Sequence, residues 1–165
     1  MVVGDGPARG RLAELLPDAA FLGFRGGAEL ATAYAAFDAF VHTGPFETFC
    51  QTVQEAKATG LPVLAPDAGG VRDLVEPGVT GWLFDTGTGS PDLRDRVRTW
   101  RDDPALRRRM GLAARASTDG RTWPAVCEEL LGHYTALTAN GSHGTHHLVT
   151  RGSATGRPSA VDTAA

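Results

Sequence analysis

The residues of this chain whose spacing best suits chemistry are two glutamates, with an expected helix start between them. Glu47 and Glu55 stand eight residues apart. Thr48 is followed three positions later by Gln51, which is a capping-box pattern, so we expect a helix to begin at about Phe49. With about 1.5 Å of rise per residue, the two carboxylates should lie roughly 10 Å apart along the helix axis.

The amino end of a helix attracts negative charge. Its first N–H groups lack partners within the helix, and the helix macrodipole adds to their positive potential. A carboxylate, a helix end suited to phosphate and a second carboxylate match the layout of a nucleotide sugar. We therefore expect the sugar at Glu47, the pyrophosphate at the helix start and the ribose at Glu55.

Composition and charge narrow the class of protein. A chain of 165 residues fits one domain with its own core, and a net charge of −3 with scattered arginines predicts no nucleic-acid surface. No apolar run approaches the ~18 residues of a membrane span, and no signal peptide follows Met1. Cys50 and Cys127 lack metal-ligand spacing, so we expect free thiols and a cytoplasmic location.

Short apolar runs alternate with helical patterns along residues 1–138. We expect strands near residues 2–3, 20–23, 38–42, 62–65 and 81–84. We expect helices at about residues 8–16, 29–37, 49–59, 71–75, 91–102, 104–116 and 123–138. The alternation predicts an α/β fold, a Rossmann-like parallel sheet with helices on both faces. Ligands of such sheets bind beyond the carboxyl ends of strands, where the Glu47 loop begins.

The pattern ends near residue 139. Residues 139–165 are rich in Gly, Ser, Thr and His and contain few large apolar side chains, so we expect a disordered tail. Three of the five histidines lie there, and this composition favours a solvated tail over a metal site.

Six motifs occur in order along residues 2–138. They are Val-Gly-Asp-Gly-Pro at 3–7, Phe-Leu-Gly at 21–23, Glu-Leu at 29–30 with Tyr-Ala at 34–35, the run from 47 to 55, Gly-Leu-Pro-Val at 60–63 and Gly-Gly-Val-Arg-Asp-Leu-Val at 69–75. Together they resemble the carboxyl-terminal domain of retaining GT-B glycosyltransferases of family 4. The run from Phe40 to Ala56 is similar to that of actinobacterial GDP-mannose-dependent α-mannosyltransferases, which build glycolipids and phosphoinositol mannosides.

The resemblance implies roles for the residues around the helix start. Glu47 would be the catalytic residue, binding hydroxyls of the donor sugar near the reacting face. The N–H groups of Phe49, Cys50 and Gln51 would hold the sugar and the adjacent phosphate. Glycine is common in the broader family where Cys50 stands, so cysteine here either narrows the sugar site slightly or is the usual residue of this subgroup.

The nucleotide half of the donor would bind further along. Glu55 would accept hydrogen bonds from the ribose hydroxyls, and Phe24 and Arg25 would line the base pocket. His42 follows a strand, where it either shapes the site or is simply a histidine with its hydrogen bonds satisfied. Cys50 at a helix start should have a lowered thiol pKa, but no base partner is evident, which disfavours a nucleophilic role.

The resemblance also marks what this chain lacks. It corresponds to the carboxyl-terminal half of a GT-B fold without its first strand–helix unit, which in the family supplies an Arg and a Lys to the leaving diphosphate. Arg9 and Arg11 are no evident substitute. A lipid or glycan acceptor would bind mostly to an amino-terminal domain, which would also provide any peripheral association with the inner face of the plasma membrane.

The implied function is binding of a nucleotide-sugar donor, with GDP-mannose favoured, for retaining α-mannosyl transfer. No metal or other cofactor is needed in the scheme usually drawn for the family. The alternatives are an inactive fragment that binds nucleotide weakly at most, and a GT-B enzyme that uses a UDP-sugar.

Overall fold

The computed structural model describes residues 1–87 and 91–140, so nearly all of the predicted tail lies outside the described residues. The chain forms two compact units, Met1–Thr122 and a second that begins at Trp123. The elements in chain order are α1 (Arg9–Leu15), α2 (Gly27–Ala35), β1 (Phe40–Val41), α3 (Gln51–Ala58), β2 (Val63–Pro66), the 3-10 helix η1 (Gly69–Asp73), β3 (Gly81–Phe84), α4 (Pro91–Asp102), α5 (Pro104–Ala116) and α6 (Trp123–Asn140).

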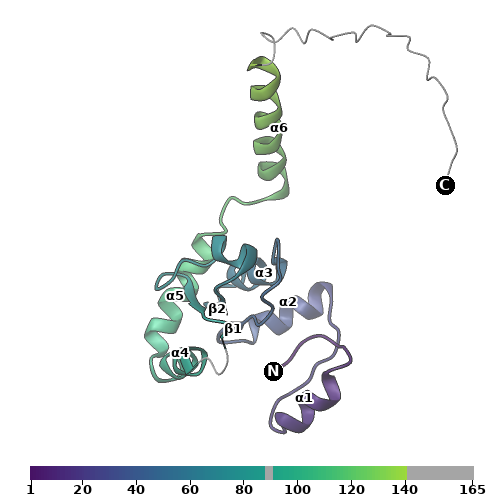
Figure 1. Cartoon of the computed structure of the whole chain (residues 1–165), viewed down its shortest axis with the longest axis vertical. Helices are drawn as coiled ribbons and strands as arrows, with labels where there is room; N and C mark the ends of the chain where they lie inside the picture. Colours follow the sequence, from purple (N-terminus) through teal and green to yellow (C-terminus); the bar gives the residue numbers. More distant parts are fainter. Residues whose placement is uncertain (88–90, 141–165) are drawn as a thin grey trace, which may run out of the picture. The chain divides into compact units, whose positions relative to one another are not determined.

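The sheet is parallel, with strand order β1-β2-β3. Phe40 pairs with Val63, and Leu64 pairs with Trp82. Helices α4 and α5 lie to one side of the strands, and α1 and α2 lie to the other (Figure 1). The predicted α/β fold with a parallel sheet is therefore confirmed. All four residues of β2 are buried, as expected for a central strand covered on both faces.

The prediction of strands at residues 2–3 and 20–23 is wrong. Only one parallel bridge forms there, between Val2 and Phe21. Among the described residues, no backbone hydrogen bond joins this bridge to β1. A two-stranded pairing without a further neighbour is marginally stable in water, which accounts for its short length here.

The core consists of two apolar clusters, one on each side of β2. The first joins Val53 and Ala56 of α3 to Val63. In the second, Trp82 of β3 stacks on Trp100 of α4, with ring centroids 4.9 Å apart. The first cluster therefore holds α3 against the sheet.

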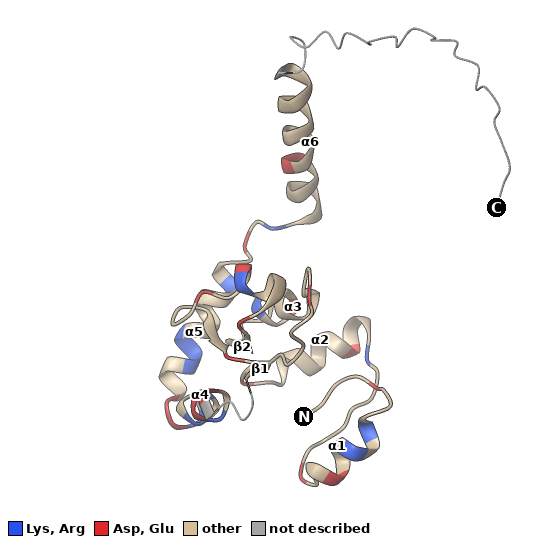
Figure 2. Cartoon of the chain, in the orientation of Figure 1, with Lys and Arg blue, Asp and Glu red and all other residues tan. Residues whose placement is uncertain are grey.

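Helices α4 and α5 are rich in charged residues. On α4, exposed or partly exposed arginines and aspartates form pairs within the helix, with Arg96 3.0 Å from Asp92 and Arg98 3.3 Å from Asp95. Such exposed pairs contribute at most about 1 kcal/mol each. Helix α5 differs because it carries four arginines and no acidic residue (Figure 2).

Close packing of α3 against α5 gives a stability prediction at Gly111. A Cβ there would overlap the carbonyl oxygen of Gly60, so Gly111→Ala should lower the free energy of unfolding by about 1–3 kcal/mol despite the better helix propensity of alanine. Gly10→Ala in α1 is the matched control, because a Cβ there meets open space. Urea unfolding of both variants checks this, and equal stability of the two would contradict the packing.

Candidate functional site

Helix α3 begins with a left-handed turn. Its first residue is Gln51, and the N-cap residue Cys50 has φ 47° and ψ 59°. In the described part of the chain, Cys50 is the only residue other than glycine with a positive φ. No side chain caps the helix, so the predicted capping box of Thr48 and Gln51 is wrong. The helix also begins two residues after the predicted start at Phe49, because the turn at Cys50 leaves Thr48 outside the first helical turn.

The loop that carries Glu47 is held against η1 through its backbone. The Gly70 N–H donates to the Glu47 carbonyl oxygen at 2.8 Å. A Cβ on Gly70 would overlap the Thr48 carbonyl, and one on Gly69 would lie 2.6 Å from the Glu47 carbonyl oxygen. Only glycine permits this approach. The sequence indicated a turn at these two glycines but not their contact with the Glu47 loop.

The helix start offers unpaired backbone donors next to a carboxylate. The N–H groups of Phe49, Cys50 and Gln51 donate to no acceptor among the described residues. Phe49 and Glu47 are exposed beside them. The structure therefore brings together the four residues predicted to hold the sugar and the phosphate, in an arrangement suited to an anion.

Cys50 is buried and faces a histidine. Its side chain is 3% exposed, and its Sγ lies 3.5 Å from His42 Nε2. Burial raises the thiol pKa, and the charge of Glu47 raises it further. The predicted lowering of this pKa is therefore wrong, because lost hydration outweighs the helix start. Sequence reasoning also missed that His42 lies next to the thiol.

Glu55 lies further along α3, where it is half-buried. The Tyr34 hydroxyl donates to Glu55 Oε2 at 3.2 Å and lies 3.3 Å from the Thr52 carbonyl oxygen. Burial of Tyr34 raises its pKa, and the Glu55 carboxylate raises it further. The tyrosine thereby fixes one oxygen of the carboxylate, and sequence spacing gave no sign of this pair.

The predicted base-pocket residues, Phe24 and Arg25, make only local polar contacts among the described residues. Phe24 is 79% exposed, and Arg25, which precedes α2, lies 3.8 Å from Glu29 of that helix. No hydrogen bond or ion pair between described residues joins either of them to α3. Their part in a nucleotide site stays a prediction.

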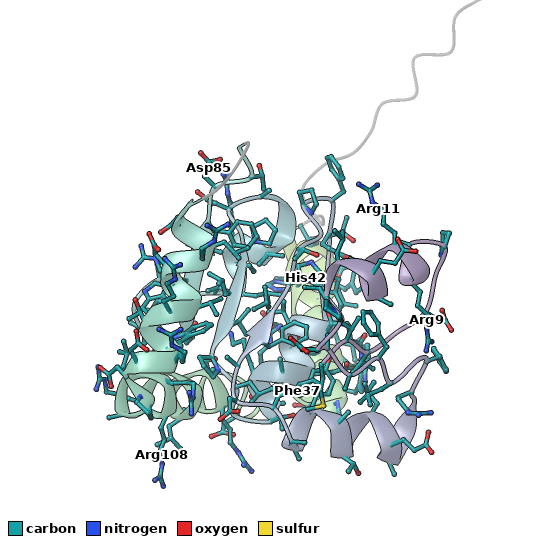
Figure 3. The ribbon with its side chains drawn as sticks, turned by 90° about the horizontal axis from the view of Figure 1, so that it is seen from below. Arg9, Arg11, Phe37, His42, Asp85 and Arg108 are labelled. Carbon is teal, nitrogen blue, oxygen red and sulfur yellow. The ribbon has the colours of Figure 1, made fainter. Side chains whose placement is uncertain are left out.

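The arginines of α1 also lie away from the middle of the site. In Figure 3, His42 lies near the centre of the view, whereas Arg9 and Arg11 lie toward one side. Arg9 pairs with Asp5 at 3.2 Å. That neither arginine substitutes for the cations of the family stays a prediction.

A cavity of about 380 Å³ lies elsewhere, at the amino edge of the sheet. Phe37 and Asp38 before β1, Pro62 before β2 and Arg108 of α5 are among its lining residues. It contains none of the predicted site residues. The helix start is the better candidate, because ligands of parallel sheets bind beyond the carboxyl ends of strands.

Residues 1–87 and 91–140 contain no group of three or more His, Cys, Asp or Glu side chains placed to hold a metal ion. None of their helices has both the length and the apolar character needed to cross a membrane.

Comparison with known proteins identifies the family. Residues 2–117 match the family model described as glycosyl transferases group 1. The chain belongs to this family. It is 55% identical over 137 residues to a GDP-mannose-dependent alpha-mannosyltransferase of Mycobacterium tuberculosis, covering 83% of this chain and 35% of that protein. A relative of the same name in Mycolicibacterium smegmatis is 54% identical over 142 residues, covering 86% of this chain and 37% of that protein.

Solved structures agree with this membership of the family. The crystal structure of Anabaena Alr3699/HepE with UDP-glucose has a TM-score of 0.68 and 28% identity, covering 82% of this chain and 40% of that one. The carboxyl-terminal domain of LpcC from Francisella tularensis shares the fold, with a TM-score of 0.58 and 20% identity, covering 68% of this chain and 61% of that one. The chain thus has the fold of one half of a GT-B glycosyltransferase and spans about a third of the length of the curated relatives named above.

The burial of Cys50 gives a prediction about thiol reactivity. Iodoacetamide should modify the exposed Cys127 in the native protein and reach Cys50 only after unfolding, because Cys50 is buried and its thiol pKa is raised. Mass spectrometry of timed samples measures the extent of modification at both cysteines, and the Cys127→Ala variant isolates the slow reaction of Cys50. Modification of both cysteines at one rate in the native protein would contradict the placement of Cys50.

Proposed function

We propose that this domain binds a nucleotide-sugar donor at the start of α3, and that GDP-mannose is the donor. The observation that carries the proposal is the set of unpaired N–H groups between Glu47 and Glu55. The sugar would contact Glu47, the diphosphate the helix start and the ribose Glu55. The 55% identity to a GDP-mannose-dependent alpha-mannosyltransferase supports the choice of base and sugar.

In the whole protein, the domain would serve retaining α-mannosyl transfer to a lipid or glycan acceptor. Glu47 would orient the sugar hydroxyls, and the N–H groups of Phe49, Cys50 and Gln51 would stabilise the phosphate beside the reacting carbon. No step in this scheme assigns a role to a metal. Charge builds on the departing diphosphate, and Arg9 and Arg72 are each already paired with an aspartate. We therefore expect transfer by this chain alone to be very slow.

A UDP-sugar is the second candidate donor. This candidate is supported by the similarity to Alr3699/HepE, which is 28% identical to this chain and whose crystal structure contains UDP-glucose. The identity to the mannosyltransferases is about twice as high, which favours GDP-mannose. A cytoplasmic location also belongs to the proposal.

Titration calorimetry of the full chain tests the donor. We expect GDP and GDP-mannose to bind, and UDP and UDP-glucose to bind more weakly. Tighter binding of the UDP pair would favour the second candidate, whereas no binding of either pair would support an inactive fragment.

The same titration should distinguish the contributions of Glu55 and Tyr34 to GDP affinity. Glu55→Ala removes the acceptor for the ribose hydroxyls, and hydrogen bonds to charged groups contribute about 1.5–3 kcal/mol, so the dissociation constant for GDP should rise at least about tenfold. Tyr34→Phe is the matched control, since it removes the hydroxyl on Glu55 Oε2 but keeps the carboxylate. Unchanged GDP affinity in Glu55→Ala would contradict the ribose assignment.

A further inference from the structure

His42 stands directly after β1, at the edge of the sheet where α3 begins. Its backbone N–H donates to the Leu64 carbonyl oxygen at 2.9 Å, which ties it to β2. A Cβ on Gly44 would lie 3.2 Å from His42 Nε2 and 3.7 Å from Glu47 Oε1. The imidazole and the carboxylate therefore flank the same glycine.

The contact between His42 and Cys50 coincides with backbone strain. Cys50 adopts the left-handed conformation, where glycine would carry no steric cost. Strained residues persist where the surrounding structure requires them, and they concentrate at functional sites. What the cysteine provides here, and a glycine would not, is a sulfur atom 3.5 Å from His42 Nε2.

The contact with the thiol leaves one nitrogen of the imidazole for a ligand. Cys50 Sγ lies 3.5 Å from His42 Nε2, within hydrogen-bonding distance for sulfur, so this contact occupies Nε2 whichever of the two atoms carries the hydrogen. The Nδ1 atom has no partner among the described residues, and His42 is only partly buried.

We propose that His42 is a further donor-site residue that contacts the transferred sugar, and that Cys50 is its positioning residue. The Nδ1 atom of His42 forms a hydrogen bond with a hydroxyl of the hexose beside Glu47. This inference rests on the proposed function, because it places the sugar at the Glu47 end of α3. It also explains a buried cysteine at a glycine-favouring position: the side chain acts through His42 and does not line the sugar site itself.

The test compares the sugar half of the donor with the nucleotide half. In the full chain, His42→Ala should raise the dissociation constant for GDP-mannose about fivefold or more, and leave that for GDP unchanged, because Glu55 holds the nucleotide about two helical turns away. His42→Asn should restore most of the lost affinity, since an amide side chain can replace Nδ1 in a hydrogen bond with a hydroxyl. Cys50→Gly should reproduce the selective loss while relieving the backbone strain.

Each of the other outcomes would contradict a specific part of this proposal. If His42→Ala weakens GDP and GDP-mannose equally and lowers the melting temperature, the histidine is only structural. If His42→Ala changes neither constant, it does not contact the sugar. If Cys50→Gly changes neither, the positioning role is wrong. If the unaltered chain binds neither ligand, the proposed function itself fails, and the His42 assignment fails with it.

Discussion

The start of α3 depends on a backbone contact between two loops that only glycine permits. The Gly70 N–H bonds the Glu47 carbonyl oxygen at 2.8 Å, and a side chain at residue 70 would occupy the place of the Thr48 carbonyl. This contact fixes the path of the chain after Glu47. The left-handed turn at Cys50 then leads into α3, whose first N–H groups have no acceptor among the described residues. A backbone with such free donors suits an anion.

The two ends of the site are held by different means. At the amino end, His42 and Cys50 lie beside Glu47, and their positions follow from the strand end and the tight loop. Further along α3, Glu55 is held by Tyr34 from α2. Because Val53 and Ala56 anchor the opposite face of α3 in the core, the helix keeps the two ends at a fixed separation.

The sequence predicts the helices well where nearby residues alone determine their ends. The bounds of α4 and α5 agree with the prediction, and at α5 the Asp103 side chain accepts from the Leu106 N–H while Pro104 opens the helix. The α3 start was misplaced because a contact with Gly70, far along the chain, overrides the local capping pattern. The pairs His42–Cys50 and Tyr34–Glu55 join separate elements, so spacing along the sequence could not reveal them. The family resemblance supplied the site residues, but not how the fold holds them.

An anionic donor bound to the backbone at the start of α3 should change the surroundings of the amide groups there. The most direct measurement is the amide spectrum of 15N-labelled chain titrated with GDP-mannose. We expect the largest shifts at the N–H groups of Phe49, Cys50 and Gln51, with smaller ones at Gly44 and Gly70. Shifts confined to the cavity at the amino edge of the sheet, around Gly60 and Arg108, would contradict this account.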